Sequence, residues 1–226
     1  MENLITIDGP SGVGKGTLAI SLAKRLHWHY LNSGSLYRIL AYLADQKHSD
    51  YLNIENLTKL TNNLKIDFKI TNNEDLIVTL DDKNVTNIIQ TEECAKKASI
   101  IASNKVIRKS LVQTQRMFYK KPGLVAEGRD MGSVIFQEAE YKFFLQASNK
   151  IRAERRHKQL KLKGINVSLS RLISELNKRD KRDLSRKSSP LIVPNGAVVI
   201  NTDNLSINEV IEQVVKHCKK LFETKN

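Results

Sequence analysis

The first seventeen residues constrain the fold of this chain more than any other stretch. Leu4–Asp8 reads as a short buried strand, and Gly9–Thr17 is a glycine-dense loop that ends in Gly-Lys-Gly-Thr. A helical pattern follows at once, with Leu18, Leu22 and Leu26 on one face. Strand, glycine loop and helix in this order predict a phosphate-binding loop (P-loop), because backbone N–H groups and the helix N-terminus together hold phosphate oxygens.

The lysine of the loop narrows the class of ligand. Lys15 would add a point charge on the β- and γ-phosphates, so we predict that the chain binds a nucleoside triphosphate. Gly16 follows the lysine and the hydroxyl of Thr17 comes one position later. This order is typical of small nucleotide kinases, whereas switch GTPases place the hydroxyl directly after the lysine. The residues predicted to bind ATP are Gly9, Pro10, Ser11, Gly12, Val13, Gly14, Lys15, Gly16 and Thr17.

The composition is that of an ordinary globular α/β domain. The chain has 226 residues, of which 40% are hydrophobic and 27% charged. It contains no apolar run near the roughly 20 residues that cross a bilayer, and its first strand leaves no room for a signal peptide. Cys94 and Cys218 stand far apart and are expected to be reduced thiols. We therefore expect a cytoplasmic protein with no membrane partner.

The net charge of +13 predicts polyanionic partners. Much of the excess lies between Lys142 and Lys187, where no RNP motif or zinc-finger spacing occurs. A phosphate-handling site plus a solvated basic surface explains this charge, and no specific nucleic acid is expected as a partner. A nucleic-acid-binding module stays open as an alternative, and a salt-dependent gel shift would support it.

The rest of the chain alternates short apolar runs with helical patterns. Strands are predicted at 29–31, 124–126, 142–145 and 197–200, and helices at 15–26, 33–46, 54–64, 92–104, 106–120, 149–163, 168–182 and 207–222. Period-two alternation around Phe68 and Val78 predicts a small antiparallel insertion over about 65–86. The whole pattern favours a three-layer α/β/α fold with a central parallel sheet.

Charged residues gather where predicted strands end. Arg38 lies one turn into the helix after the second strand, where it can point back at the carboxyl edge of the sheet. Glu127 follows a buried strand, in the place of an acid that organises Mg²⁺ through water, and Arg129-Asp130 stands between glycines. The alternatives are a surface arginine behind a Ser33 helix cap, and a turn with a local ion pair.

Two further clusters lie on the late charged helices. Arg152 and Arg156 are four residues apart and share a helix face, so one of them can reach a transferring phosphoryl group. Arg179–Arg186 holds mixed charges that could serve phosphates and a ribose hydroxyl. In both clusters the alternative is a solvated helix face.

In order and spacing, these stretches resemble bacterial cytidylate kinases nearly end to end. The matching segments are Ile7–Thr17, Ser33–Arg38, Glu127–Gly132, Arg152–Arg156 and Arg179–Asp183. The resemblance implies a single P-loop kinase domain over 1–226. Its core would comprise 1–64, 105–148 and 190–226, with an acceptor-binding insertion at about 65–104 and a helical lid at about 149–189. It also implies a monomer.

The resemblance also implies roles for individual residues. Gly9–Thr17 would hold the ATP phosphates, with Mg²⁺ carried by ATP and contacted, through water, by Thr17 and Glu127. Lys15, Arg129, Arg152 and Arg156 would be the catalytic cations. The residues implied for the acceptor nucleotide are Arg38, Arg129 and Arg186 for its phosphate, Ser99, Arg108 and Asp130 for cytosine, Arg179 and Asp183 for the sugar, and Ser33 as a further contact.

This sequence departs from the family pattern at a few positions. Asn32 and Gln146 stand where aspartate is common, Gln137 where proline is common, and Asn201–Asp203 replaces an Asp-Thr-Thr-like end. None of these changes removes a charge that is assigned to phosphate binding. Asn32 and Gln146 bear on the local hydrogen bonding around the acceptor and lid hinges.

The expected reaction is in-line transfer of the ATP γ-phosphoryl group to CMP or dCMP. Two alternatives stay open. A kinase of the same fold could act on UMP, AMP or shikimate. A regulatory GTPase is suggested by Asn177–Asp180, which matches a guanine-reading pattern, but that copy ends an amphipathic helix instead of following a buried strand.

Overall fold

A five-stranded parallel sheet forms the centre of the molecule. The computed structural model describes residues 1–51, 53–62, 64–162, 164–186 and 188–223. The strands are β1 (Leu4–Asp8), β2 (His29–Asn32), β6 (Leu124–Gly128), β7 (Tyr141–Gln146) and β8 (Val198–Asn201), in the order β2-β6-β1-β7-β8. Every residue of β1 and β6 is buried, which is characteristic of parallel strands covered on both faces. The predicted central parallel sheet is confirmed.

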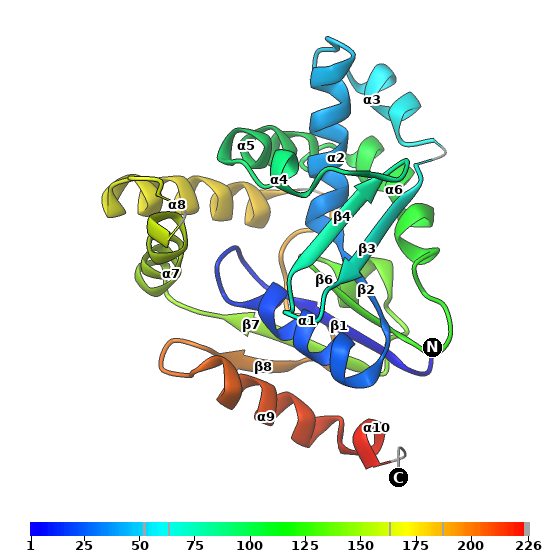
Figure 1. The fold of residues 1–226 in the computed structure, drawn as a ribbon, viewed down its shortest axis with the longest axis vertical. Coiled ribbons are helices and arrows are strands. Elements are labelled where there is room, and N and C mark those ends of the chain that lie inside the picture. The colour runs from blue at the N-terminus through cyan, green and yellow to red at the C-terminus, as the bar shows by residue number, and fades with distance from the viewer. Residues whose placement is uncertain (52, 63, 163, 187, 224–226) are drawn as a thin grey trace.

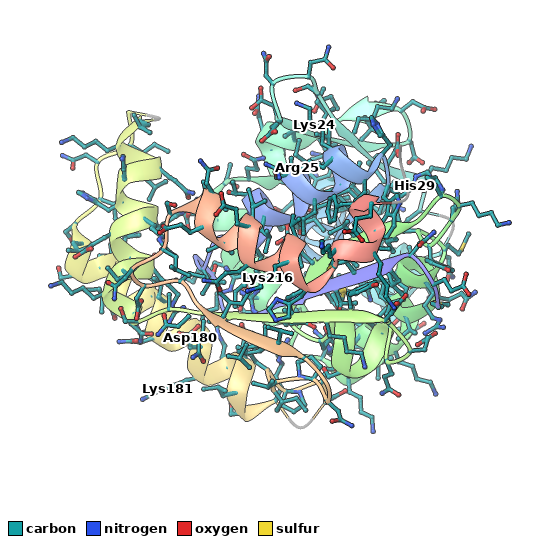
Figure 2. The ribbon with its side chains drawn as sticks, turned by 90° about the horizontal axis from the view of Figure 1, so that it is seen from below. Lys24, Arg25, His29, Asp180, Lys181 and Lys216 are labelled. Atoms are coloured by element: carbon teal, nitrogen blue, oxygen red, sulfur yellow. The ribbon has the colours of Figure 1, made fainter. Side chains whose placement is uncertain are left out.

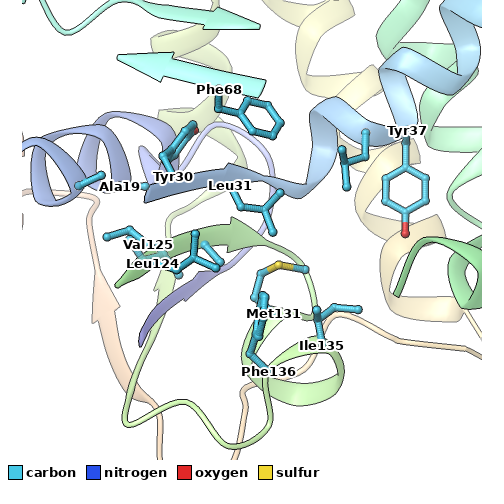
Figure 3. Close-up of a cluster of buried hydrophobic side chains, with 14 of the residues drawn as sticks. Ala19, Tyr30, Leu31, Tyr37, Phe68, Leu124, Val125, Met131, Ile135 and Phe136 are labelled. Carbon is cyan, nitrogen blue, oxygen red and sulfur yellow. The ribbon is translucent and has the colours of Figure 1, made fainter. Parts of the chain in front are cut away.

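Helical layers cover both faces of this sheet. The helices α1 (Lys15–Leu26) and α9 (Ile207–His217) pack side by side (Figure 2). On the opposite side of β2 and β6 from Ala19 of α1 lies η1 (Met131–Ile135), a single π-helical turn (Figure 3). The helix α6 (Lys105–Arg116) packs against η1. The three-layer α/β/α arrangement predicted from the sequence is thus confirmed.

A small antiparallel sheet packs on the core, and Phe68 is one of the side chains that join the two. It comprises β3 (Ile66–Ile70), β4 (Leu76–Leu80) and β5 (Lys83–Asn84), with Phe68 opposite Val78. Phe68 meets the ring of Tyr30 edge-on, with ring centroids 5.9 Å apart (Figure 3). Burial of Phe68 therefore helps to hold the small sheet against β2.

Two groups of helices extend beyond the sheet (Figure 1). One is α2 (Ser33–Gln46), α3 (Ile54–Leu60), α4 (Thr86–Ile89) and α5 (Glu92–Ile101). The other is the pair α7 (Asn149–Leu162) and α8 (Leu169–Ser185), which has its own small hydrophobic cluster around Ala153 and Leu172. Of the first group, α4 and α5 fall within the predicted insertion, whereas α2 and α3 belong to the predicted core; α7 and α8 fall within the predicted lid. The division into core, insertion and lid stays a prediction.

Five of the predicted helices end at other residues than expected, and one of them, α8, continues to Ser185 beyond the predicted 182. Residue 163, the predicted end of α7, lies outside the described residues. The helix α3 ends at Leu60, four residues early, where the Thr61 hydroxyl donates to the Thr58 carbonyl at 2.7 Å. The helix α6 ends at Arg116, and α5 ends at Ile101 because Asn104 caps α6. The last helix breaks at Cys218 into α9 and α10 (Lys219–Glu223). Among the described residues, no helix combines the length and apolarity needed to span a membrane.

Candidate active site

The predicted P-loop connects β1 to α1 in a conformation that requires glycine. Gly14 caps α1 with a φ of 96°, in the left-handed region that side chains rarely adopt. Gly9 has a φ of 146°, and a Cβ atom there would collide with the carbonyl oxygen of Leu145 in β7. The loop borders a cavity of about 550 Å³, which Glu127 and Arg156 also line. This is space for a ligand at the N-terminus of a helix, where anions bind.

Lys15 puts a buried amine at this cavity. Its side chain donates to the Pro10 carbonyl at 2.7 Å, and the residue is only 7% exposed. Burial lowers the pKa of Lys15 well below its usual value, the nearby Arg129 lowers it further, and Glu127 partly offsets both. A phosphate anion in the cavity would favour the charged amine, because an opposite charge stabilises it.

Glu127 ends β6 in a network of polar side chains. Its Oε1 atom accepts hydrogen bonds from the Tyr30 hydroxyl at 2.5 Å and from Asn32 Nδ2 at 2.8 Å. The Asn32 side chain also caps α2 by accepting from Ser35 N at 3.0 Å. Burial raises the pKa of Glu127, and Lys15 opposes that rise. Asn32, which departs from the family pattern, therefore serves here as a donor to this carboxylate.

The position of Glu127 also accounts for the glycine after the P-loop lysine. A Cβ atom at Gly16 would lie 3.2 Å from Glu127 Oε1, which is a tight approach. Any side chain at Gly16 would press on the carboxylate. The carboxylate and the loop thus lie against each other, and the role of Glu127 beside bound phosphates stays a prediction.

All nine residues predicted for the acceptor nucleotide line one narrow pocket next to the P-loop cavity. They are Ser33, Arg38, Ser99, Arg108, Arg129, Asp130, Arg179, Asp183 and Arg186. Five guanidinium groups and two carboxylates leave a formal charge of 5 − 2 = +3 in this pocket. The structure therefore brings together residues that are up to 153 positions apart, Ser33 and Arg186, around a cationic space.

The two carboxylates of the acceptor pocket are paired with arginines. Arg108 Nη2 contacts Asp130, and both side chains are almost completely buried. Arg129 Nε donates to Asp183 at 2.9 Å, and Arg186 lies 3.3 Å from the same carboxylate. Burial would raise the pKa of Asp183, but these arginines outweigh it and lower the pKa.

Among the pocket cations, Arg179 contacts a neutral hydroxyl group. Burial, followed by repulsion from Arg129, lowers the pKa of Arg179 to about 9. Its Nη1 atom contacts the Ser11 hydroxyl of the P-loop at 3.3 Å. An anionic ligand would relieve the repulsion between these two guanidinium groups.

The acceptor pocket contains buried polar atoms that lack partners within the described part of the chain. They include Tyr37 Oη, Ser99 Oγ and the Nε atoms of Arg108 and Arg179. Buried polar groups in native proteins almost always have hydrogen-bond partners. A polar ligand in this pocket would supply such partners.

The two pockets meet in a third space between them. Lys15 and Glu127 of the P-loop side line it together with Arg38, Arg129 and Arg179 of the acceptor side. Arg38 is held there by donating to the carbonyls of Ile89 at 2.6 Å and Thr91 at 3.3 Å. Phosphate groups from two ligands could therefore approach each other among these cations.

The two arginines predicted on the lid helix occupy different environments. Arg156 lines the P-loop cavity and forms an ion pair with Glu92 at the start of α5. Arg152 is 2% exposed and donates to the Ser11 carbonyl at 3.0 Å, while pairing with Asp180. These contacts are those of a residue that supports the P-loop, and contact of Arg152 with the phosphoryl group stays a prediction.

Three residues outside the predicted set shape the site. Tyr37 presents its unpartnered hydroxyl to the acceptor pocket, and Gln115 accepts a hydrogen bond from Ser33. Asp8 accepts from the backbone N–H groups of Met131 and Gly132, both at 2.8 Å, and so ties β1 to the Arg129-Asp130 turn. The sequence could have drawn attention to Asp8 and Gln115, because each is a polar residue in a pattern whose other members are buried.

The other departures from the family pattern lie at the edges of the site. Gln137 donates to the Ser133 carbonyl at 2.8 Å, and the exposed Gln146 accepts through its backbone from Thr202 N at 2.8 Å. Asp203 accepts from Ser148 N at 2.7 Å, directly before α7. The structure therefore shows a local hydrogen bond at each departure, and none of these residues lines the acceptor pocket.

The family model and the relatives that this chain matches all point to the same family. The cytidylate kinase family model matches residues 5–220. The chain is 44% identical to the cytidylate kinase of Shewanella denitrificans over 217 residues, which is 96% of each chain. It is 44% identical to that of Proteus mirabilis over 218 residues, again 96% of each. It is 46% identical to that of Colwellia psychrerythraea over 213 residues, 94% of each. With matches of this length beside a P-loop and a cationic pocket, the chain belongs to the cytidylate kinase family.

Proposed function

We propose that this protein transfers the γ-phosphoryl group of ATP to CMP or dCMP, giving ADP and CDP or dCDP. The observation that carries the proposal is the joining of the P-loop cavity to the cationic pocket through a space lined by Lys15, Arg129 and Arg179. The relatives named cytidylate kinase support a cytosine nucleotide as the acceptor.

The chemistry requires positioning and charge more than proton transfer. The acceptor phosphate is already anionic near neutral pH, so the reaction needs no general base. Catalysis comes from holding the two phosphates in line and from cations that meet the charge developing between them. Arg129 is a candidate for this role, because it lines both the acceptor pocket and the connecting space, as Arg38 and Arg179 also do.

Selection of the base follows from the buried Arg108–Asp130 pair. Cytosine carries an amino donor beside ring N3 and O2 acceptors. In the proposed complex, Asp130 accepts from the amino group and Arg108 donates to the acceptors. Uracil would turn a carbonyl toward the carboxylate, and a mismatched buried polar pair discriminates strongly.

The oxygen donors beside the P-loop fit Mg²⁺ bound to ATP. Thr17 and Glu127 line the P-loop cavity, and hydroxyl and carboxylate oxygens are hard ligands of the kind that Mg²⁺ takes. No cluster of three or more acidic, histidine or cysteine side chains suited to a metal occurs in the described ranges. These residues would therefore hold Mg²⁺ largely through water and the phosphates, and the ion would neutralise phosphate charge.

An ADP-release assay across candidate acceptors tests the proposal. With ATP and magnesium, CMP and dCMP should give the highest turnover among CMP, dCMP, UMP, AMP and shikimate. Lys15→Met should lose most of this activity. Faster turnover of UMP, AMP or shikimate would assign a different acceptor, and acceptor-independent GTP hydrolysis would favour the GTPase alternative. The monomeric state and cytoplasmic location stay predictions.

A further inference from the structure

Gln115 is a buried amide whose orientation is fixed by its surroundings. It is 0% exposed on α6, and its Nε2 atom donates to the Leu111 carbonyl at 3.2 Å. Its Oε1 atom accepts from the Ser33 hydroxyl at 2.6 Å. The reversed amide would turn its oxygen toward the Leu111 carbonyl, and two acceptors cannot form a hydrogen bond. The amide therefore presents its oxygen, and not its NH₂ group, to Ser33.

This orientation determines what Ser33 can offer a ligand. A serine hydroxyl has one proton and two acceptor lone pairs. The proton of Ser33 is committed to Gln115, and within the described residues no other hydrogen bond reaches Ser33 Oγ. Ser33 lines the acceptor pocket together with Asp130. Toward that pocket the hydroxyl is thus an acceptor only.

We infer that Gln115 is a positioning residue for base selection, which makes the acceptor pocket favour a pyrimidine with an amino group by keeping Ser33 an acceptor. This inference rests on the proposed function and names a determinant of its specificity. The amino group of cytosine can donate to Ser33 Oγ. The corresponding carbonyl of uracil would face a second acceptor in a buried place, where an unsatisfied polar pair is costly.

The test is a substitution that releases the Ser33 proton without changing Ser33. Gln115→Met keeps a similar volume and removes both polar atoms, so the hydroxyl can rotate and donate to a uracil carbonyl. The CMP:UMP ratio of kcat/KM should fall about tenfold, the size expected for one polar mismatch, mainly through faster use of UMP. If Gln115 had only a structural role, the substitution would slow the reactions of CMP and UMP alike and leave the ratio unchanged.

Two comparisons make the result specific to Ser33. In a Ser33→Ala background, Gln115→Met should change the ratio by less than about twofold, because the hydroxyl it acts through is gone. Gln115→Glu, in its neutral form as burial favours, keeps a donor for the Leu111 carbonyl and an acceptor beside Ser33, and should retain the wild-type ratio. If Gln115→Met does not fold, Gln115→Leu removes the same polar atoms with a smaller side chain.

The outcomes separate this inference from the proposed function. A wild-type enzyme that prefers CMP, with an unchanged ratio in Gln115→Met or Gln115→Leu, overturns the role of Gln115 alone. A wild-type enzyme that does not prefer CMP overturns the proposed function instead. A ratio that falls equally in the presence and absence of the Ser33 hydroxyl also rejects the inference.

Discussion

The positively charged side chains of the acceptor pocket outnumber the carboxylates that can pair with them, and this excess governs the chemistry of the single residues. The acceptor pocket holds five guanidinium groups but only Asp130 and Asp183 to balance them. Arg179 contacts a neutral hydroxyl, whereas Arg108, Arg129 and Arg186 each contact a carboxylate. The surplus charge is available to a ligand, and the paired arginines are held in place before the ligand arrives. Preorganised cations of this kind lower a barrier without first having to move.

We predict that Arg129→Ala lowers kcat/KM for CMP by about 10²–10⁴, as expected for loss of a charge contact in the transition state. Asp183 keeps Arg186 as a partner at 3.3 Å, so folding should survive, and a thermal melt checks this. Arg25→Ala, which removes an exposed arginine of α1 (Figure 2), is the matched control. Turnover like that of the wild type in Arg129→Ala would remove this residue from the mechanism.

We predict that Asp130→Asn weakens the preference for CMP over UMP and also destabilises the protein. The substitution leaves Arg108 buried without its carboxylate partner, and breaking such a pair costs about 3 kcal/mol. The two measurements are the CMP:UMP ratio of kcat/KM and urea unfolding. If stability falls while the ratio stays the same, Asp130 holds Arg108 but does not read the base.

At the scale of elements, the periodicity of apolar residues correctly predicted those strands and helices whose bounds depend on local sequence. The strand β1 and the helices α1 and α2 begin and end where the apolar pattern and the loop glycines place them. The turn η1 was not predicted, because its first N–H groups are bound by Asp8, which is more than 120 residues away in sequence. No local pattern contains that contact.

The residues of the candidate site also divide into those that local sequence could predict and those that depend on long-range contacts. Arg179, Asp183 and Arg186 are spaced as one face at the end of α8, and all three line the acceptor pocket, whereas Lys181 between them is exposed. Helical spacing could have separated pocket charges from solvated ones. The role of Gln115 could not be derived from the sequence, because it depends on α6 and the start of α2 lying side by side.

We predict that Phe68→Ala destabilises the protein by about 3–5 kcal/mol, the usual cost of removing a buried phenylalanine. Phe68 packs on Tyr30 and on Phe118, with a centroid distance of 5.3 Å to the latter. Urea unfolding measures the change, and Val106→Ala, at a position that is 53% exposed, should cost less than about 0.5 kcal/mol. Equal effects at the two positions would mean that the small sheet is not anchored through this ring.

At the scale of the whole molecule, side-chain contacts join the two groups of helices that extend beyond the sheet. The ion pair between Arg156 and Glu92 joins α7 to α5, and Arg152 joins α7 to the P-loop. The Arg156–Glu92 pair is partly exposed, so it contributes at most about 1 kcal/mol. A contact this weak can open when nucleotides enter, whereas the buried Arg152 network keeps the base of α7 fixed.

The stability of the whole fold should depend on pH through Asp8. Burial raises the pKa of Asp8 to about 7, against the hydrogen bonds from Gly132 and Met131, and the charge of Asp130 raises it further. In the unfolded chain the pKa is near the ordinary 3.8. From about pH 4 to about pH 7 the folded protein therefore keeps a proton that the unfolded chain has lost. The free energy of unfolding from this group is greatest below pH 4 and falls by up to about 1.4 kcal/mol per pH unit as the pH rises to 7.

The comparison of wild type with Asp8→Asn isolates this contribution, because Glu127 and Lys15 titrate in both proteins. Urea unfolding from pH 4.5 to 8 should show the wild type losing stability relative to Asp8→Asn up to about pH 7, with a constant difference above that. Parallel curves throughout would show that Asp8 is ionised in the folded protein at every pH tested. The two backbone N–H groups would then outweigh burial, and β1 would be joined to the Arg129-Asp130 turn by a full negative charge.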